Sequence, residues 1–293
     1  MEPHEQDYHS LQPGATIPQI AKRELYDREL DFTAIPKHLI KVLTYNIWDK
    51  QEYWQERIEH VVRLIKEHGP DVGCLLDVSE NCYNYLNTEL EKSYIIFQVF
   101  LLEGDRIGMV LLCKRDTVNL PEGSQPYYYD FTSGSGRVIG VELELLSNSE
   151  RFHVLCTKLD DHRDNDHIRS DQFAVVQQVI KKLRNCIVVG DFNIFRDGED
   201  CLQKIMASKL DDAWTKMGCP NRVKYTFDGK RNRITQDRSQ LRASRIYYMG
   251  SHLHVKSLGL IGTSYISDSL KITPSCHYGL IGTFQCEKLT ERY

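Results

Sequence analysis

The stretch Cys186-Ile187-Val188-Val189-Gly190-Asp191-Phe192-Asn193 carries the most information about the fold. Its four apolar residues predict a buried strand, which ends at a glycine followed by an acidic and an amide side chain. Sites are often built at strand ends, and carboxylate and amide oxygens suit a divalent metal or a phosphate. Asp and Asn also favour ordinary turns, so 190–193 taken alone fits both interpretations.

Three further segments place polar side chains beside predicted strands. The run 39–45 predicts a strand that ends at Asn46, and the run 72–76 predicts one that ends at Asp77. His277 comes just before the last predicted strand. A lone histidine is more often structural than catalytic, but its occurrence together with three polar strand ends favours one shared site.

Strand-like runs alternate with a few long helices along the chain. Apolar residues at helical spacing predict helices over 51–68, near 80–92 and over 168–184, and Gly69-Pro70 ends the first of them. Further strands are predicted at 94–102, 107–113, 138–146, 151–157, 244–249 and 279–285. This order predicts an α/β fold, a two-layer β-sandwich flanked by helices.

The proline-bearing segment 1–38 shows no sustained period and is expected to be an N-terminal tail or arm, with one domain over 39–293. The chain is 41% hydrophobic and 27% charged, as in ordinary globular proteins. It contains no run of roughly 18 apolar residues, so no membrane partner is expected. Nothing in the sequence calls for an obligate oligomer.

Nine cysteines without a C-x-x-C pair predict reduced, buried thiols. The polar, acidic N-terminus does not resemble a secretory signal. Both features predict an intracellular protein of the nucleus or cytoplasm that is not secreted. The net charge of -4 offers no global attraction for nucleic acid, so such a partner would need a local basic surface, for which the turn-rich stretch 228–243 is the candidate.

The ordered motifs resemble those of the endonuclease/exonuclease/phosphatase superfamily, and within it the tyrosyl-DNA phosphodiesterases, from about Ile40 to Phe284. That family carries threonine-tryptophan-asparagine, leucine-glutamine-glutamate, glycine-aspartate-any-asparagine and serine-aspartate-histidine. This chain reads, in the same order, Thr44-Tyr45-Asn46, Leu75-Leu76-Asp77, Gly190-Asp191-Phe192-Asn193 and Ser275-Cys276-His277. The resemblance implies the family's fold.

The resemblance also implies roles for individual residues. It implies metal binding by Asp77, orientation of the nucleophile by Asp191 and Asn193, and stabilisation of the pentacovalent phosphate by His277. Asn46 would assist at the metal or phosphate. The implied substrate contacts are Arg137, Lys158, Tyr225 and Phe227. An active enzyme of this kind would use Mg²⁺ or Mn²⁺ on a DNA or RNA end, and an inactive one would need no metal.

The departures from the family pattern fall on catalytic positions. Asp77 replaces a glutamate, which withdraws the carboxylate by about 1.5 Å, and Lys158 replaces a histidine. Cys276 replaces the aspartate that pairs with the histidine, and Ser244 replaces another aspartate. Residues that act as a unit fail together. The sequence therefore predicts a catalytically impaired pseudoenzyme that binds nucleic acid or a protein, and the alternative is an active metal-dependent phosphodiesterase of altered specificity.

Two other features are interpreted as structural. The acidic and histidine-bearing segment 160–167 precedes a predicted helix, where such residues are expected as caps and surface turns. Cys276 and His277 are adjacent in an extended segment and should point to opposite faces, so they are not expected to form a nucleophilic pair.

Overall fold

The computed structural model describes residues 39–100, 107–267, 269 and 271–287. The expected tail over 1–38 and the end of the predicted strand 94–102 lie outside the described residues. Within these ranges, none of the helices has the length and apolar character needed to cross a membrane.

The first sheet has six strands in the order β14-β15-β1-β2-β4-β3. Strand β1 is central and pairs parallel with β2 and antiparallel with β15. The strands are β1 (Leu39–Asn46), β2 (Val72–Ser79), β3 (Tyr94–Phe100), β4 (Ile107–Lys114), β14 (Leu253–Ile261) and β15 (Gly279–Cys286).

The second sheet runs β10-β13-β9-β8-β7-β5, and β6 also pairs with β7. Strand β9 pairs parallel with β8 and antiparallel with β13. The strands are β5 (Val118–Asn119), β6 (Tyr127–Asp130), β7 (Arg137–Leu145), β8 (Arg151–Lys158), β9 (Cys186–Asp191), β10 (Asp211–Asp212) and β13 (Ser244–Met249). A separate pair is formed by β11 (Phe227–Asp228) and β12 (Gln240–Leu241).

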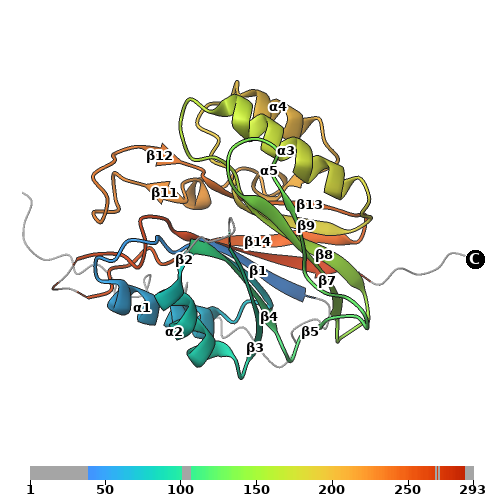
Figure 1. Cartoon of the computed structure of the whole chain (residues 1–293), viewed down its shortest axis with the longest axis horizontal. Coiled ribbons are helices and arrows are strands. Elements are labelled where there is room, and N and C mark those ends of the chain that lie inside the picture. Colours follow the sequence, from blue (N-terminus) through green and yellow to red (C-terminus); the bar gives the residue numbers. More distant parts are fainter. Residues whose placement is uncertain (1–38, 101–106, 268, 270, 288–293) are drawn as a thin grey trace, which may run out of the picture. The chain divides into compact units, whose positions relative to one another are not determined.

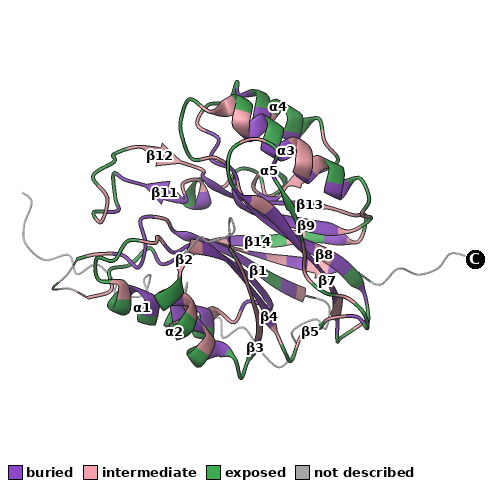
Figure 2. Ribbon diagram, viewed as in Figure 1, coloured by how far each residue is buried: buried purple, intermediate pink, exposed green. Residues whose placement is uncertain are grey.

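Helices flank the two sheets (Figure 1). Helices α1 (Trp54–His68) and α2 (Glu80–Leu90) pack on the first sheet, and α3 (Asp166–Ile180) and α4 (Asp200–Met206) pack on the second. The short α5 (Ala213–Lys216) and a 3-10 turn (Asn221–Val223) precede β11. The predicted sandwich with flanking helices is confirmed. Its central strands are buried, the edge strand β14 is partly exposed, and the helices expose one side (Figure 2).

Helix α1 shows how the sequence pattern produces this layering. Its apolar residues at i, i+3, i+4 and i+7 form one buried stripe, which includes Ile58, Val61, Val62 and Ile65. Gly69 adopts a left-handed conformation with φ of 53° and donates its N–H to the Ile65 carbonyl. Glycine accepts this conformation without steric cost, so the helix stops there.

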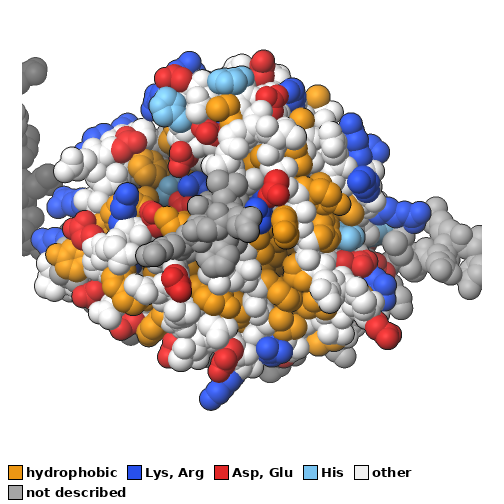
Figure 3. All heavy atoms as spheres, in the orientation of Figure 1, with side chains coloured by type: hydrophobic (Ala, Val, Ile, Leu, Met, Phe, Trp, Pro, Cys, Tyr) orange, Lys and Arg blue, Asp and Glu red, His pale blue; other side chains and the backbone are white. Residues whose placement is uncertain are grey.

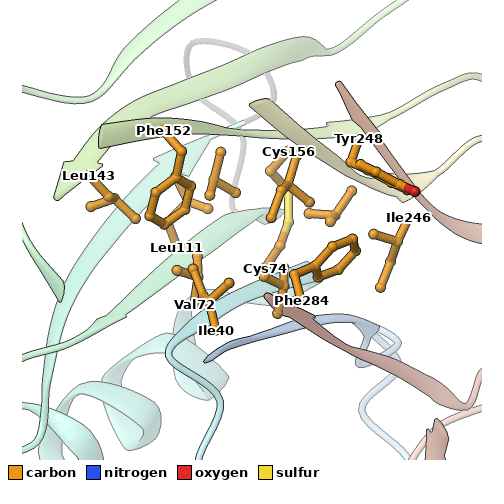
Figure 4. Packing of buried hydrophobic residues seen from close by; sticks show 14 of the residues in the cluster. Ile40, Val72, Cys74, Leu111, Leu143, Phe152, Cys156, Ile246, Tyr248 and Phe284 are labelled. Atoms are coloured by element: carbon orange, nitrogen blue, oxygen red, sulfur yellow. A yellow bond between two sulfur atoms is a disulfide. The ribbon is translucent and has the colours of Figure 1, made fainter. Parts of the chain in front are cut away.

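The core between the sheets is apolar (Figure 4). It contains a disulfide between Cys74 of β2 and Cys156 of β8, whose Cα atoms are 6.2 Å apart. The expectation that all thiols are reduced is therefore wrong for this pair. Of the seven free cysteines, six are buried and Cys219 is exposed.

The topology brings the ends of β1 and β9 together. Each is a central strand with a parallel neighbour, and the two strands pack against each other across the sandwich. Both strands end in a polar side chain, Asn46 on β1 and Asp191 on β9. These ends form the floor of the site.

Candidate functional site

A cleft of about 590 Å³ opens where these strands end. Six of the residues predicted at the site line it: Asn46, Asp77, Lys158, Asp191, Asn193 and His277. The others are Trp48, Asp49, Lys50, Ile107, Asp161 and Cys276. The four ordered motifs thus converge on one cavity, as expected from strand ends that meet at one edge of a sandwich.

Asn46 links the two carboxylates at the floor of the cleft. Its Nδ2 donates to Asp77 Oδ2 at 2.8 Å and to Asp191 Oδ2 at 2.9 Å, and its Oδ1 accepts the Trp48 backbone N–H at 3.0 Å. The other oxygen of Asp191 accepts the Ser244 hydroxyl at 2.6 Å. Asp191 is 1% exposed, so these bonds supply the compensation that a buried carboxylate requires.

Gly190 is needed for Asp191 to reach this position. Its φ is 141°, and a Cβ built there would lie 1.7 Å from the Thr157 carbonyl oxygen on β8. No side chain fits that approach. The glycine therefore lets β9 pass close to β8 and deliver Asp191 to the cleft.

Asp77 reaches the cleft through an irregularity in β2. The pairing of β2 with β4 shifts register between Leu75 and Val78, and Asp77 has a φ of 53°. A non-glycine residue held there costs about 1–3 kcal/mol. The bulge turns the Asp77 side chain toward Asn46 and Lys158.

Lys158 forms a bidentate ion pair with Asp77. Its Nζ lies 2.9 Å from Oδ1 and 3.0 Å from Oδ2, and the two side chains are 18% and 14% exposed. The exposed Asp161 lies 3.3 Å from the same Nζ. Burial opposes the charge on Lys158, but the attraction of Asp77, with Asp161 and Asp191, overcomes it and raises the pKa of Lys158. The ammonium is therefore charged at neutral pH.

The His277 ring lies beside Asp191, but Nδ1 of the ring is not hydrogen-bonded to the carboxylate. Its Nδ1 is buried, lies 3.9 Å from Asp191 Oδ2 and has no hydrogen-bond partner among the described residues. The ring contacts Phe227 edge-on at 5.2 Å. Burial raises the pKa of the neighbouring Cys276 thiol to about 12, so that this side chain is neutral at pH 7 and gives the imidazole no counter-charge.

The cleft as a whole is acidic. Four carboxylates line it, from Asp49, Asp77, Asp161 and Asp191, against the ammonium groups of Lys50 and Lys158. A phosphate group entering this cleft would meet net negative charge. Its chemistry favours a cation at the centre, a position that the Lys158 ammonium takes in this structure.

The remaining residues predicted at the site lie around the cleft. Phe227 is buried behind His277. Tyr225 lines two neighbouring cavities instead, with the Lys224 ammonium 5.2 Å from its ring. Arg137 lies outside the cleft. It pairs with Asp130 of β6 at 2.8 Å.

Several lining residues were not singled out by the sequence. Trp48, Asp49 and Lys50 directly follow the strand end at Asn46, and that position was the available signal. Asp161 was assigned to a surface turn, whereas it lines the cleft three residues from Lys158. The rest of that acidic segment fits the structural interpretation, since Asp166 accepts the backbone N–H groups that open α4.

The sequence pattern of the Endonuclease/Exonuclease/phosphatase family matches residues 43–268. Tyrosyl-DNA phosphodiesterase 2 of Xenopus tropicalis is 26% identical over 252 residues, which cover 83% of this chain and 65% of that protein. The Rattus norvegicus protein of the same name is 27% identical over 238 residues, covering 78% and 62%. The chain thus spans less than two thirds of these relatives.

Solved structures share the fold. TDP2 of D. rerio, crystallised with a single-strand DNA product, superposes with a TM-score of 0.74 at 18% identity, covering 84% of this chain and 99% of that one. An endonuclease/exonuclease/phosphatase from Bacteroides vulgatus gives a TM-score of 0.70 at 19% identity, covering 85% and 99%. At these identities the likeness establishes the architecture.

Proposed function

The chain belongs to the Endonuclease/Exonuclease/phosphatase family, and from that premise we propose that it is a tyrosyl-DNA phosphodiesterase 2-like domain with impaired metal-dependent catalysis that binds a nucleic-acid end as a scaffold. One observation carries the proposal. The Asp77 carboxylate, at the position that corresponds to the metal-binding glutamate, has both oxygens bound by Lys158.

The residues present do not fit the divalent metal that the family implies. Magnesium needs oxygen ligands at about 2.0–2.1 Å in near-ideal octahedral geometry, but the Lys158 ammonium contacts both Asp77 oxygens and Asn46 contacts one of them. We therefore derive no catalytic step through a metal.

The substitution at Cys276 supports the same conclusion. A carboxylate next to a catalytic histidine holds the imidazole in place and stabilises its charged form. The neutral thiol of Cys276 does neither, and His277 Nδ1 is left without a partner among the described residues. Stabilisation of a developing phosphate charge by His277 would be weaker as a result.

The binding part of the proposal rests on a second cavity. A hollow of about 1350 Å³ between the 3-10 turn and β14 is lined by Arg222, Lys224 and Arg231 with one carboxylate, Asp228. Three tyrosines also line it: Tyr225, Tyr265 and Tyr278. Aromatic rings that stack bases beside cations that follow the backbone are the usual elements of single-strand binding. Lys and Arg side chains also gather where β11 and β12 lie (Figure 3).

A working metal-dependent phosphodiesterase is the second candidate. The observation that favours it is the hydrogen-bonded arrangement around Asp191, where Asn46 and Ser244 hold the carboxylate and His277 lies 3.9 Å away. A divalent ion would have to displace Lys158 from Asp77 before this arrangement could act.

One paired experiment separates the candidates. The wild type and a variant carrying Asp77→Glu, Lys158→His, Ser244→Asp and Cys276→Asp are assayed on a 5′-phosphotyrosyl oligonucleotide with Mg²⁺ or Mn²⁺. We expect the wild type to bind the oligonucleotide in EDTA, with an affinity that falls steeply with salt, and only the variant to cleave it. Wild-type cleavage that Asp191→Asn abolishes would establish the second candidate. Failure of the wild type to bind any oligonucleotide would redirect the scaffold toward protein partners.

A further inference from the structure

A third cavity, of about 580 Å³, lies on the opposite side of β13 from the core between the sheets. Residues of α4, α5, β12 and β13 line it, together with the segment that follows Asn193. It shares no lining residue with the cleft at Asp77 and Asp191. It is therefore separate from that cleft, whereas it shares Lys224, Tyr225 and Gln240 with the hollow beside the 3-10 turn.

Arg245 brings a buried positive charge to this cavity. The residue is 7% exposed, and its guanidinium donates to the Arg242 carbonyl and to the Tyr247 hydroxyl, each at 3.2 Å. Both partners are neutral. No described carboxylate lies within ion-pair distance of Arg245. A buried charge without a counter-charge is costly, so this wall of the cavity favours an anion.

Arg242 stands beside Arg245 but has its own counter-ion. It binds both oxygens of Asp212 at 2.5 Å and lies over the Trp214 ring at 4.5 Å. Burial and the neighbouring Arg245 charge lower the pKa of Arg242, and Asp212 opposes that shift. Asp212 also caps α5 by accepting the Trp214 backbone N–H. Its oxygens are thus engaged, and Asp212 does not neutralise the second arginine.

The whole lining is cationic. Five Lys or Arg side chains and three carboxylates line it. Within the described part of the chain, two of these cations, Arg245 and Lys224, have no carboxylate partner. The rings of Trp214 and Tyr225 also line the cavity, with Arg242 over the first and Lys224 over the second. An arginine fork binds phosphate oxygens in two parallel hydrogen bonds, and aromatic rings accept a base.

We propose that this cavity is an anion site for a phosphate group carried on a nucleotide, with Arg245 as its principal ligand, Lys224 as a second cation and Trp214 beside the base. The phosphate could belong to a free nucleotide or to a nucleic-acid strand. The inference rests in part on the proposed nucleic-acid binding, because Lys224 and Tyr225 also line the hollow beside the 3-10 turn. Arg245 and Trp214 line this cavity and not that hollow, so the Arg245 variants test the two separately.

The test uses the full chain and calorimetric titration with four probes: inorganic phosphate, uridine 5′-monophosphate, uridine and a short single-stranded oligonucleotide. We expect the phosphate-bearing probes to bind and uridine to bind at least tenfold more weakly. Binding of the monophosphate identifies a free nucleotide as sufficient, whereas binding of the oligonucleotide alone identifies a strand phosphate.

Three variants decide whether Arg245 is responsible. Arg245→Gln should weaken the phosphate-bearing probe at least tenfold. Arg184→Gln, the same change at an exposed arginine outside the cavity, should leave it within twofold. Arg245→Lys keeps the charge without the fork and should give intermediate weakening.

A second readout separates binding from a structural role. Without ligand, Arg245→Gln removes an uncompensated buried charge and should melt at or above the wild-type temperature. The proposal is overturned if no phosphate-bearing probe binds, if uridine binds equally well, or if Arg245→Gln binds like the wild type. It is also overturned if Arg245→Gln and Arg245→Lys both melt well below the wild type.

Discussion

Replacing Lys158 by Met removes the positive charge at the centre of the cleft and leaves Asp77 partly buried without a counter-charge. Breaking a fully buried ion pair costs about 3–5 kcal/mol, and an exposed pair contributes about 0.2–1 kcal/mol. The two side chains are 18% and 14% exposed, which places this pair between those limits. We expect Lys158→Met to lower the free energy of unfolding by about 2 kcal/mol, or the melting temperature by ~4–8 °C for a domain of this size.

The assay is urea unfolding at pH 7 in a double-mutant cycle with Asp77→Asn. Once the Asp77 charge is gone, Lys158→Met should cost far less, which would give a coupling energy of about 1.5 kcal/mol. Lys66→Met is the matched control, because Lys66 pairs with Glu89 at 2.7 Å but both side chains are more than a third exposed. That change should stay within about 0.5 kcal/mol of the wild type.

The pH dependence of the pair has a defined sign. The pKa of Lys158 is raised in the folded protein, so the stabilisation from its charge is fully present below the ordinary lysine pKa and is lost only as the pH rises through the higher folded value. The difference between the wild type and Lys158→Met should therefore be constant from pH 6 to 9. A cycle with coupling below about 0.5 kcal/mol would refute the assignment of Lys158 as the partner of Asp77.

The same variant tests the cation argument directly. Without Lys158, the carboxylates of Asp77, Asp161 and Asp191 lose the ammonium that they surround. Lys158→Met should then bind Mn²⁺ at least tenfold more tightly than the wild type does. Titration with Mn²⁺ monitored by electron paramagnetic resonance measures this difference. Adding Asp191→Asn should reverse most of that gain. Equal Mn²⁺ binding by the wild type and Lys158→Met would show that Lys158 does not occupy a cation position.

Three other outcomes are expected. In urea unfolding, Gly190→Ala should lower the free energy of unfolding by about 3 kcal/mol or prevent folding, because the added Cβ would overlap a carbonyl of β8. Gly198→Ala is the control, since nothing lies within 4 Å of its added Cβ. It should change the free energy of unfolding by less than about 0.5 kcal/mol. Arg57→Gln should cost about 3 kcal/mol in urea unfolding, because the buried guanidinium donates to five backbone carbonyls. An alkylating reagent should label the exposed Cys219 at least tenfold faster than Cys276 up to pH 9, as measured by mass spectrometry. Burial raises the pKa of Cys276 to about 12 and keeps its thiol protonated. Faster labelling of Cys276 would contradict this.

Much of the fold could be predicted from local pattern. Strands β1 and β9 are continuous apolar runs that end at a polar residue, and α1 has a clear stripe closed by Gly69-Pro70. Strand β14 was missed because it is an edge strand with only one neighbour, and its half-exposed residues show no clean alternation. Helix α4, with seven residues, is too short for a helical period to be evident.

Most residues that line the cleft could be predicted from the sequence, but the contacts between their side chains could not. Polar residues at strand ends were expected to converge, and Asn46, Asp77, Asp191 and His277 do. The contact between Asp77 and Lys158 joins residues 81 positions apart and depends on the left-handed bulge in β2, for which the sequence gives no local signal. Register and bulges are set by tertiary packing.

These contacts change how the substitutions in the site are understood. Independent decay of a catalytic site would leave buried polar groups unpaired, and each such group costs about 1–3 kcal/mol. Here Asp77 and Lys158 bind each other, and Ser244, which stands in place of an aspartate, donates its hydroxyl to Asp191. Among the cleft residues described, only His277 has a buried side-chain polar atom without a partner. If the domain is the scaffold we propose, the changes at Asp77 and Lys158 are one coupled replacement, in which the Lys158 ammonium takes the place of a cation at the Asp77 carboxylate.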